Sequence, residues 1–590
     1  MKILLVHPHD SVEVGAWAGT RWDLVIDLGW SGRHAYAQQT ERLGCRVFSI
    51  HDFLDHDENR RLVRETLAAG LDQLVDSEAV DWWEVFSPYA TLQLQQLILS
   101  SALVEQIPAT AEIFATRNHF VTQALSQILS REVKCFSVEI TGGPQVRSRR
   151  YLQAVFALRP AQIVEIAFDK WDSDYRLRRH FVPAPATLST PVTLLPSAYG
   201  NVTRAQVAYA RMLPDRRFLL VVTRRSGRLK TLPGNVDTRS LASYATRSLS
   251  TTEQERAHLL QRWQVLQNDR FATHPILGLA RKLQVFDGFA IFLKWGLRVR
   301  DAWREVFVRE PITTVLSADE YNPYTRLPIL LARARRLRTV FCDHGALGMS
   351  FGVRTPVSDA YLMKGEMARD YAISWCGLSA GKIVVGGPAE MCPPLSSADQ
   401  TQKDQTQEYR SQKARPQNDW IVFYSEAYEL SDGRAQALYA GLLPELCSLA
   451  RRTNRKVIIK LHPFESFRVR KLFVDKALSA EQRSVVEIRQ GPMTPDLFAR
   501  AWCSLTVESS VAVESTLHGV PCFLCSWFDA SWYDYGKQFA KFSAGYPLAS
   551  PRQIREIPNL LEQFHITDAI RRRLHATISA EQLEAVLSGG

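Results

Sequence analysis

Short apolar runs alternate with amphipathic segments along almost the whole of this 590-residue chain. The apolar runs predict buried strands, and segments such as "LQLQQLILSSALVEQI" and "RLPILLARARRLR" have the spacing of helices. The order strand, helix, strand predicts parallel sheets with helices on both faces. The predicted strands of the N-terminal part lie in "KILLVHP", "DLVIDLG", "RVFSI", "AEIFATR", "TLLPSAYG", "FLLVVTR", "TVLSADE", "TVFCDHG" and "KIVVGG".

The length exceeds what one hydrophobic core supports, so we expect two or more domains. One segment, 396–418, interrupts the alternation, because it is rich in Gln, Ser, Thr and charge and its only aliphatic residues are alanines. This composition predicts a linker. We therefore predict an N-terminal α/β region at 1–395, with room for two subdomains, and a C-terminal α/β domain with terminal helices at 419–590.

The composition favours a cytoplasmic protein with anionic partners. Lys and Arg number 72 against 61 Asp and Glu, a net charge of +11, which favours a nucleotide, a phospholipid surface or an acidic glycan. A generally basic solvated surface is the alternative. Nine scattered cysteines argue against a disulfide framework, and Cys522 and Cys525 are expected to pack in a core. We expect neither a signal peptide nor a transmembrane helix.

Three predicted strands of the C-terminal part end in polar side chains that a core does not need. Ligands of open α/β sheets bind at the carboxyl ends of strands, so these tips are candidates for a binding site. The tips are "KLHP" with Lys460 and His462, "YSEAYE" with Ser425 and Glu426, and "TVESS" with Ser509 and Ser510.

The two serines stand where a helix is expected to start, at Val511, and His518-Gly519-Val520-Pro521 is expected to end that helix. Serine at a helix start can simply cap it. Alternatively, the hydroxyls and the free N–H groups of the first turn form a phosphate site, which the neighbouring Lys460 and His462 favour.

Two further points stay open at the tips. Glu514 lies one helical turn after Ser510, so it either faces the same cleft and binds ribose hydroxyls or is an exposed helix residue. Lys460 shares a face with His462 only if the strand continues that far, and His462 itself could be a buried structural residue.

The motifs "KLHP", "ESSVAVESTLHGVP" and "SWFDASWYDYG" resemble the C-terminal domain of bacterial surface-polysaccharide glycosyltransferases. The resemblance is nearest to the capsule-type transferases of Kdo, an eight-carbon ulosonic acid, and bacterial sialyltransferases use similar HP and Ser-Ser motifs on a CMP-sugar. It implies a GT-B architecture, two Rossmann-like domains facing a cleft with an enlarged N-terminal part. It also implies that His462, Ser509 and Ser510 bind the donor phosphate and that Glu514 binds the nucleotide sugar.

A second block is similar to related polysaccharide enzymes, in which strands end in Gln-His-Gly, Gly-Glu and Gly-x-Pro. This chain has Asp343-His344-Gly345, so the glutamine is replaced. The two blocks cover about 314–545, and the first 310 residues resemble no family that we can name.

Glycosyl transfer also needs a carboxylate as base or nucleophile, which in two-domain transferases usually comes from the N-terminal domain. The choices at strand ends are Asp10 and Glu13 in "HPHDSVEVG" and Asp319 and Glu320 in "LSADEYN", of which we favour Glu320 and Asp10. A helix cap or a loop charge is the alternative for each. We expect no metal, although His7 and His9 lie near Asp10, and no cofactor.

The sequence thus predicts a glycosyltransferase that moves Kdo or a related ulosonic acid from a CMP-activated donor to a surface glycan or lipid-linked acceptor. Its basic charge would hold it at the inner face of the membrane, with no role for nucleic acid. Two alternatives remain open: a polyol-phosphate transferase of the teichoic-acid kind, and a non-catalytic subunit that binds nucleotide or glycan.

Overall fold

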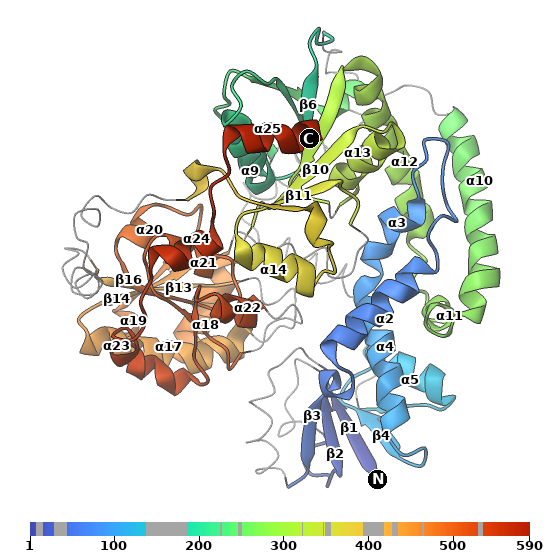
Figure 1. Cartoon of the computed structure of the whole chain (residues 1–590). Helices are drawn as coiled ribbons and strands as arrows, with labels where there is room; N and C mark the ends of the chain where they lie inside the picture. Colours follow the sequence, from blue (N-terminus) through green and yellow to red (C-terminus); the bar gives the residue numbers. More distant parts are fainter. Residues whose placement is uncertain are drawn as a thin grey trace. The chain divides into compact units, whose positions relative to one another are not determined.

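The computed structural model describes residues 1–7, 16–28, 44–136, 186–224, 227–245, 250–320, 322–345, 347, 356–392, 418–426, 435–462, 465–528 and 535–589. The chain divides into two compact units. The first comprises Met1–His56, Leu99–Ala157 and Cys392–His575, and the second comprises Asp57–Ile98, Leu158–Met391 and Ala576–Gly590. The described strands form three separate sheets (Figure 1).

The first sheet belongs to the first unit and has the order β3-β2-β1-β4-β5, with every pair parallel. Alternate apolar residues of β1, such as Ile3 and Leu5, pack with Leu99 and Leu103 of a helix, while Leu4 and Val6 pack on the opposite face. The elements are β1 (Lys2–Val6), β2 (Leu24–Asp27), β3 (Arg46–Ser49), α4 (Thr91–Gln106), β4 (Glu112–Ala115), α5 (Phe120–Leu129) and β5 (Lys134–Cys135).

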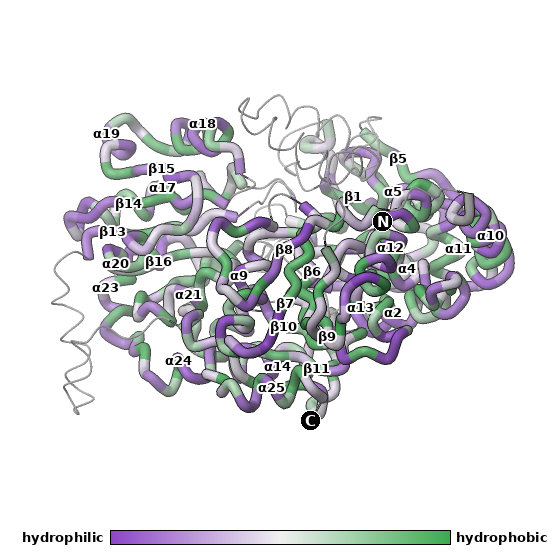
Figure 2. The backbone as a smooth tube through the Cα atoms, turned by 90° about the horizontal axis from the view of Figure 1, so that it is seen from above, coloured by the Kyte–Doolittle hydropathy of each residue, from purple (hydrophilic) through white to green (hydrophobic). Residues whose placement is uncertain are grey.

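The second sheet belongs to the second unit and has seven parallel strands in the order β12-β11-β10-β9-β6-β7-β8. Strands β6 and β7 are buried along their whole length, as expected of parallel strands that helices cover on both faces, and Figure 2 shows them mainly in green. The strands are β6 (Val192–Ser197), β7 (Phe218–Val222), β8 (Val236–Ser240), β9 (Ile312–Ser317), β10 (Arg338–Cys342), β11 (Ala360–Met363) and β12 (Ile383–Val385).

Helices from three parts of the chain complete the second unit. The C-terminal helix α25 packs on the second sheet, because Leu583 and Leu587 join the same core as Leu316 of β9 and Val340 of β10. The helices are α2 (His56–Ala68), α3 (Trp82–Phe86), α9 (Gly200–Arg211), α10 (Ser250–Leu266), α11 (Pro275–Lys282), α12 (Phe289–Arg309), α13 (Pro323–Ala334), α14 (Glu366–Ser374) and α25 (Ala580–Ser588).

The third sheet, in the first unit, has six parallel strands in the order β15-β14-β13-β16-β17-β18. Ile421 and Phe423 of β13 share a core with residues of α17 (Ala435–Arg452), whereas Val422 and Tyr424 share a core with Leu497 and Phe498 of α20 (Asp496–Ala499). The strands are β13 (Trp420–Tyr424), β14 (Lys456–Lys460), β15 (Val486–Arg489), β16 (Ala501–Thr506), β17 (Cys522–Leu524) and β18 (Tyr546–Pro547).

The helices of the third sheet connect these strands in the predicted alternation. They are α17 (Ala435–Arg452), α18 (Phe467–Ala477), α19 (Ala480–Arg483), α20 (Asp496–Ala499), α21 (Val511–Leu517), α22 (Tyr535–Lys541), α23 (Ile557–Leu560) and α24 (Asp568–Leu574).

The predicted α/β class with parallel sheets is confirmed. Numbered along the chain, each sheet places its first strand between the second and the fourth, which is the Rossmann-like, doubly wound order. There are three such sheets, because the first 136 residues contain a five-stranded sheet of their own, within the N-terminal region that we predicted to have room for two subdomains.

Several sequence-based expectations are not decided by the described residues. Asp10 and Glu13 lie outside them, as does the predicted linker except for Asn418. The domain boundaries at 395 and 419 therefore stay predictions. The structure adds that α25, which belongs in sequence to the predicted C-terminal domain, packs on the second sheet. Within the described ranges, none of the helices has the length and apolar character that crossing a membrane demands.

Candidate functional site

The third sheet contains a point at which the chain reverses its direction of travel across the sheet. From β13 the chain adds β14 and β15 on one side and then β16, β17 and β18 on the other, so the reversal lies between β13 and β16. Ligands of doubly wound sheets bind in the crevice at the carboxyl ends of such strands. The residues that follow β13, β14 and β16 lie at this edge: Ser425, Glu426, His462, Ser509 and Ser510.

A buried carboxylate that the sequence analysis missed holds two of these strand ends together. Glu465, 3% exposed, accepts hydrogen bonds at Oε1 from the Ser425 hydroxyl at 2.7 Å and from Arg470 Nε at 2.5 Å. Its Oε2 accepts the backbone N–H of His462 at 2.7 Å. Tyr439 extends the network by donating its hydroxyl to Ser425 Oγ at 2.9 Å. The turn after β14 is therefore tied to the end of β13.

A second carboxylate, Glu426, performs the same task for the serine-containing loop. Its Oε1 accepts the hydroxyl of Thr506 at 3.1 Å and the backbone N–H of Glu508 at 2.8 Å. Burial is the largest influence on Glu426 and on Glu465, and it raises the pKa of both carboxyl groups. Glu426 was predicted to bind the nucleotide sugar, whereas these two hydrogen bonds hold the loop that carries Ser509 and Ser510.

The two serines begin α21 in the way the sequence predicts. Ser510 is the N-cap residue, yet its side chain makes no capping hydrogen bond, whereas Ser509 Oγ accepts the N–H of Val511 at 3.4 Å. Simple capping therefore does not explain Ser510. The helix ends in a Schellman turn, in which Gly519 has a φ of 70° and the N–H of Val520 reaches the carbonyl of Ser515 at 2.8 Å.

His462 and Lys460 occupy different environments. Burial and, to a smaller degree, the charge of Lys460 lower the pKa of the half-buried His462, which keeps its imidazole neutral at pH 7. Lys460 is 5% exposed, and its Nζ donates to the carbonyls of Leu461 at 2.7 Å and Gly491 at 2.8 Å. Lys460 thus fixes the neighbouring loop after β15, and these bonds leave it poorly placed to hold a donor phosphate.

The remaining predicted residues of the third sheet are also placed. Glu514 is exposed on α21, one turn beyond Ser510. Cys522 and Cys525 are both 0% exposed, so they lie in the core as expected. Among the residues that the structure describes, no three His, Cys, Asp or Glu side chains meet in an arrangement that would hold a metal ion.

In the second sheet the same kind of reversal lies between β6 and β9, and Glu320 follows β9 there. Glu320 is 1% exposed, and its Oε1 accepts the hydroxyl of Ser358. An acceptor hydroxyl must reach the catalytic base, so the burial of Glu320 disfavours its action as that base in the observed conformation. Its catalytic role stays a prediction. Arg224 follows β7 in the same sheet. The Cζ atom of its guanidinium group lies 5.2 Å from the ring centroid of Tyr199 and 5.2 Å from that of Tyr324.

Asp343 stands where related enzymes have glutamine. It is 2% exposed at the end of β10, and its Oδ2 has no hydrogen-bond partner among the described residues. Burial raises the pKa of Asp343 to about 7, and the charge of Lys364 opposes this. Burial thus favours the protonated form of this carboxyl group.

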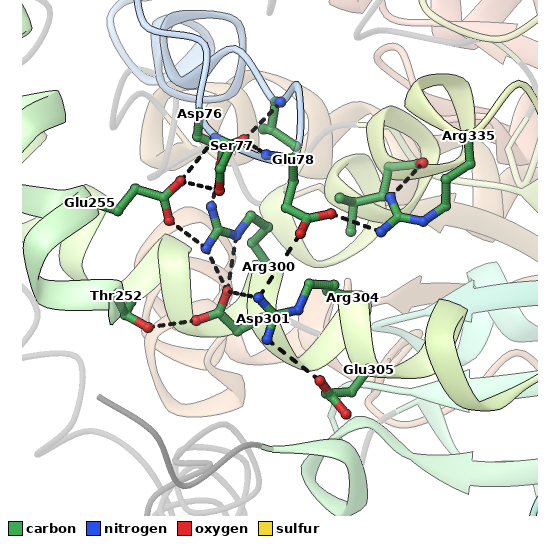
Figure 3. Close-up of polar contacts among 12 residues, drawn as sticks. Asp76, Ser77, Glu78, Thr252, Glu255, Arg300, Asp301, Arg304, Glu305 and Arg335 are labelled. Atoms are coloured by element: carbon green, nitrogen blue, oxygen red, sulfur yellow. Dashed lines mark hydrogen bonds and ion pairs between the residues drawn. The ribbon is translucent and has the colours of Figure 1, made fainter. Parts of the chain in front are cut away.

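A cavity of about 620 Å³ in the second unit is lined mainly by polar and charged residues from the loop near Asp76, from α10 and from α12. Arg300, 2% exposed, contacts Asp76 at 2.6 Å, Glu255 at 2.8 Å and Asp301 at 2.6 Å (Figure 3). Thr252 donates to the other oxygen of Asp301 at 2.9 Å. Because these groups satisfy one another, the cluster locks the loop to the two helices and is a structural feature.

No family model matches the chain, and a search of curated proteins finds no similar sequence. Solved structures resemble it at low identity. UDP-GlcNAc 2-epimerase from Methanocaldococcus jannaschii is 11% identical with a TM-score of 0.41, and the match covers 68% of this chain and 100% of that one. MurG from Acinetobacter baumannii is 12% identical with a TM-score of 0.38, and the match covers 69% and 100%.

The wall teichoic acid polymerase TagF, in the form of a variant, is 13% identical with a TM-score of 0.36, and the match covers 75% of this chain and 97% of that one. At these TM-scores, the similarity to solved structures adds no information about the fold beyond the strand orders described above.

We predict that Glu465→Gln destabilises the third sheet. The substitution removes the ion pair between Arg470 Nε and Glu465 Oε1, in which both side chains are 0% exposed. Removing one member of a buried ion pair costs about 3–5 kcal/mol, so the free energy of unfolding in urea should fall by that amount. The matched control is Glu426→Gln, whose amide oxygen can replace Oε1 in both hydrogen bonds and should cost less than about 1 kcal/mol. Equal losses for the two variants would contradict this account.

We also predict that Arg300→Met destabilises the second unit by about 3–5 kcal/mol, because it removes the ion-pair partner of Asp76 and Glu255 from a buried cluster. The control Arg304→Met, at a side chain 35% exposed, should cost about 1 kcal/mol or less.

The difference between wild type and Arg300→Met should depend on pH. Burial raises the pKa of Glu255, but hydrogen bonds from Arg300 and Ser77 outweigh it and lower that pKa from 4.5 to about 2. A group with a lowered pKa stabilises above its unfolded value and loses this contribution as the pH falls through its folded value. The difference should shrink from pH 4.5 to about 2, and a constant difference would contradict the role of Glu255.

Proposed function

We propose that this protein is a glycosyltransferase of GT-B type that binds a nucleotide-activated sugar at the crevice of the third sheet. The observation that carries the proposal is the pair of loops on either side of the end of β13. One carries His462 and is held by Glu465, and the other carries Ser509 and Ser510 and is held by Glu426. Two buried carboxylates are thus used to fix backbone at a sheet edge, which is the preorganisation that a phosphate site needs.

The donor phosphate would be held by groups that a core does not use. The hydroxyl of Ser510 makes no capping bond, and the neutral imidazole of His462 can donate one N–H to a phosphate oxygen. The first N–H groups of α21 would add to the electropositive character of this edge. Glu514, exposed one turn along α21, would meet hydroxyl groups of the nucleotide sugar.

The donor that we propose is CMP-Kdo or a related CMP-activated ulosonic acid, and the acceptor is a surface glycan or its lipid-linked start. This choice rests on the resemblance of the HP and Ser-Ser motifs. The leaving nucleotide is stabilised in this scheme by His462, the serines and the start of α21, so no metal is assigned to the site. The base is a carboxylate, and Asp10 and Glu320 remain the proposed candidates. The protein would act in the cytoplasm at the inner face of the membrane.

The proposal is tested by measuring the melting temperature of the purified protein with CMP, CDP, UDP, GDP and ADP. A bound ligand stabilises only the folded state, so we expect CMP to raise the melting temperature most. In His462→Ala the affinity for CMP should fall by about ten- to a hundredfold, since a hydrogen bond to a charged group contributes about 1.5–3 kcal/mol. Stabilisation by UDP alone would overturn the CMP donor, and no response to any nucleotide would overturn the transferase.

Ser510 provides a test that separates ligand binding from helix capping. Because its hydroxyl makes no capping bond, Ser510→Ala should leave the melting temperature without ligand near that of wild type while weakening CMP binding. Ser510→Asp should abolish binding, because like charges about 4 Å apart cost on the order of several kcal/mol at the dielectric of a cleft. The control Ser479→Asp adds the same charge at the N-cap of α19, where the serine does cap the helix. Normal CMP binding by Ser510→Asp would place the phosphate elsewhere.

A further inference from the structure

Four arginines crowd the end of α13 in the sequence "RARRLR", at positions 333, 335, 336 and 338. Three of them, Arg333, Arg336 and Arg338, line a cavity of about 290 Å³ together with Leu337 and Asp359. This volume lies just below the range of about 300–1,000 Å³ that drug-sized ligands occupy. The cavity is therefore of a size for a small charged group. It lies where β10 begins, at the edge of the second sheet opposite the strand ends discussed above.

The fourth arginine is already engaged in the structure. Arg335 pairs with Glu78 at 2.8 Å and donates to the carbonyl of Leu331 at 3.1 Å, and Figure 3 shows it turned toward Glu78. The carbonyl contact satisfies the C-terminal end of α13. Neutralising the helix end is the ordinary role of basic residues at this position, and Arg335 fulfils it.

The other three arginines have no acidic partner among the described residues. Arg338 donates its Nε to the carbonyl of Val586 at 3.1 Å, and Arg333 and Arg336 are exposed. The acid of the cavity, Asp359, already accepts the N–H and the hydroxyl of Thr339 at 2.9 and 2.8 Å. Three arginines and one aspartate leave the cavity with a net charge of +2.

The backbone turn at the end of α13 fixes the position of Arg336. The N–H of Leu337 reaches the carbonyl of Ala332 at 2.9 Å, and that of Arg336 reaches Arg333 at 2.9 Å, so the helix ends in a Schellman turn. Arg336 occupies the left-handed position of this turn with a φ of 57°, where glycine is the usual residue. Gln284, Asn454 and Ser543 also have a positive φ just beyond a helix end, so this conformation fixes the position of Arg336 and is not itself evidence for a ligand.

We propose that the cavity formed by Arg333, Arg336 and Arg338 binds a phosphate group, as a phosphomonoester or phosphodiester anion. The guanidinium fork matches the oxygens of phosphate in a bidentate manner, and an arginine that is not paired with a carboxylate can offer that fork. The same chemistry occurs in an anionic lipid headgroup and in a free phosphate. The proposal does not depend on the donor of the third sheet.

Binding to vesicles and to inorganic phosphate distinguishes the two sources. The double variant Arg333→Gln/Arg336→Gln should lose about 30-fold in affinity for phosphatidylcholine vesicles that contain phosphatidylglycerol, since each basic residue near such a surface contributes about five- to sixfold. In the second arm, the rise of the melting temperature with inorganic phosphate should be smaller in the variant than in wild type. A loss in the first arm assigns the site to a lipid headgroup, and a loss in the second alone assigns it to a soluble phosphate.

The matched control is Arg270→Gln/Lys282→Gln, which removes two charges from exposed positions of the same unit. It should change neither arm by more than about twofold, because long-range attraction is screened by salt. Arg336→Gly provides a second readout: it should relieve the left-handed backbone, so the melting temperature without phosphate stays equal or rises while binding falls. If the test pair and the control pair behave alike in both arms, or if Arg336→Gly lowers stability and leaves binding intact, the site is not there.

Discussion

The candidate donor site depends on one buried carboxylate. Glu465 receives a hydroxyl from the end of β13, a backbone N–H from the turn after β14 and a guanidinium from α18, all within 2.7 Å. A carboxylate can accept several such bonds, whereas an amide or hydroxyl at the same place could not also neutralise Arg470. The burial that raises its pKa also strengthens each of these contacts, because the local dielectric is low. The strand ends are thereby held in one arrangement before any ligand arrives.

The three sheets share one strand order, and the second and third place polar residues where the chain reverses direction. They use these positions differently. The third sheet holds Ser509, Ser510 and His462 on fixed loops, while in the second sheet Glu320 is buried against Ser358. The common order explains why ligand chemistry could arise at either sheet, and the side chains decide what each sheet offers. The arginines of the chain also differ in their environment. Arg300 and Arg470 are buried in ion pairs, whereas Arg333 and Arg336 are exposed.

Sequence periodicity predicted most strands of the second and third sheets, because buried parallel strands are continuous apolar runs that differ clearly from helices. It did not predict β8, whose sequence "VDTRS" at the end of the second sheet is half polar. The position of the serine pair at the start of α21 was also predicted, since helix starts and stops have local signals. Glu465 was missed, although it follows His462 by three residues, because an acid at that spacing more often caps a turn than joins two strands.

The sequence by itself determined the α/β class, the parallel pairing and the group of strand ends that carry polar residues, since these follow from local periodicity and from the rule that such ends share an edge. Only the tertiary structure decided that the chain builds three sheets, that α25 returns to the second of them and that Lys460 is tied to backbone carbonyls. It also decided that Glu320 is buried and that Glu426 supports a loop. The physical reason is that burial and hydrogen-bond partners come from residues far apart in the chain, as between Glu426 and Glu508, and no local pattern records them.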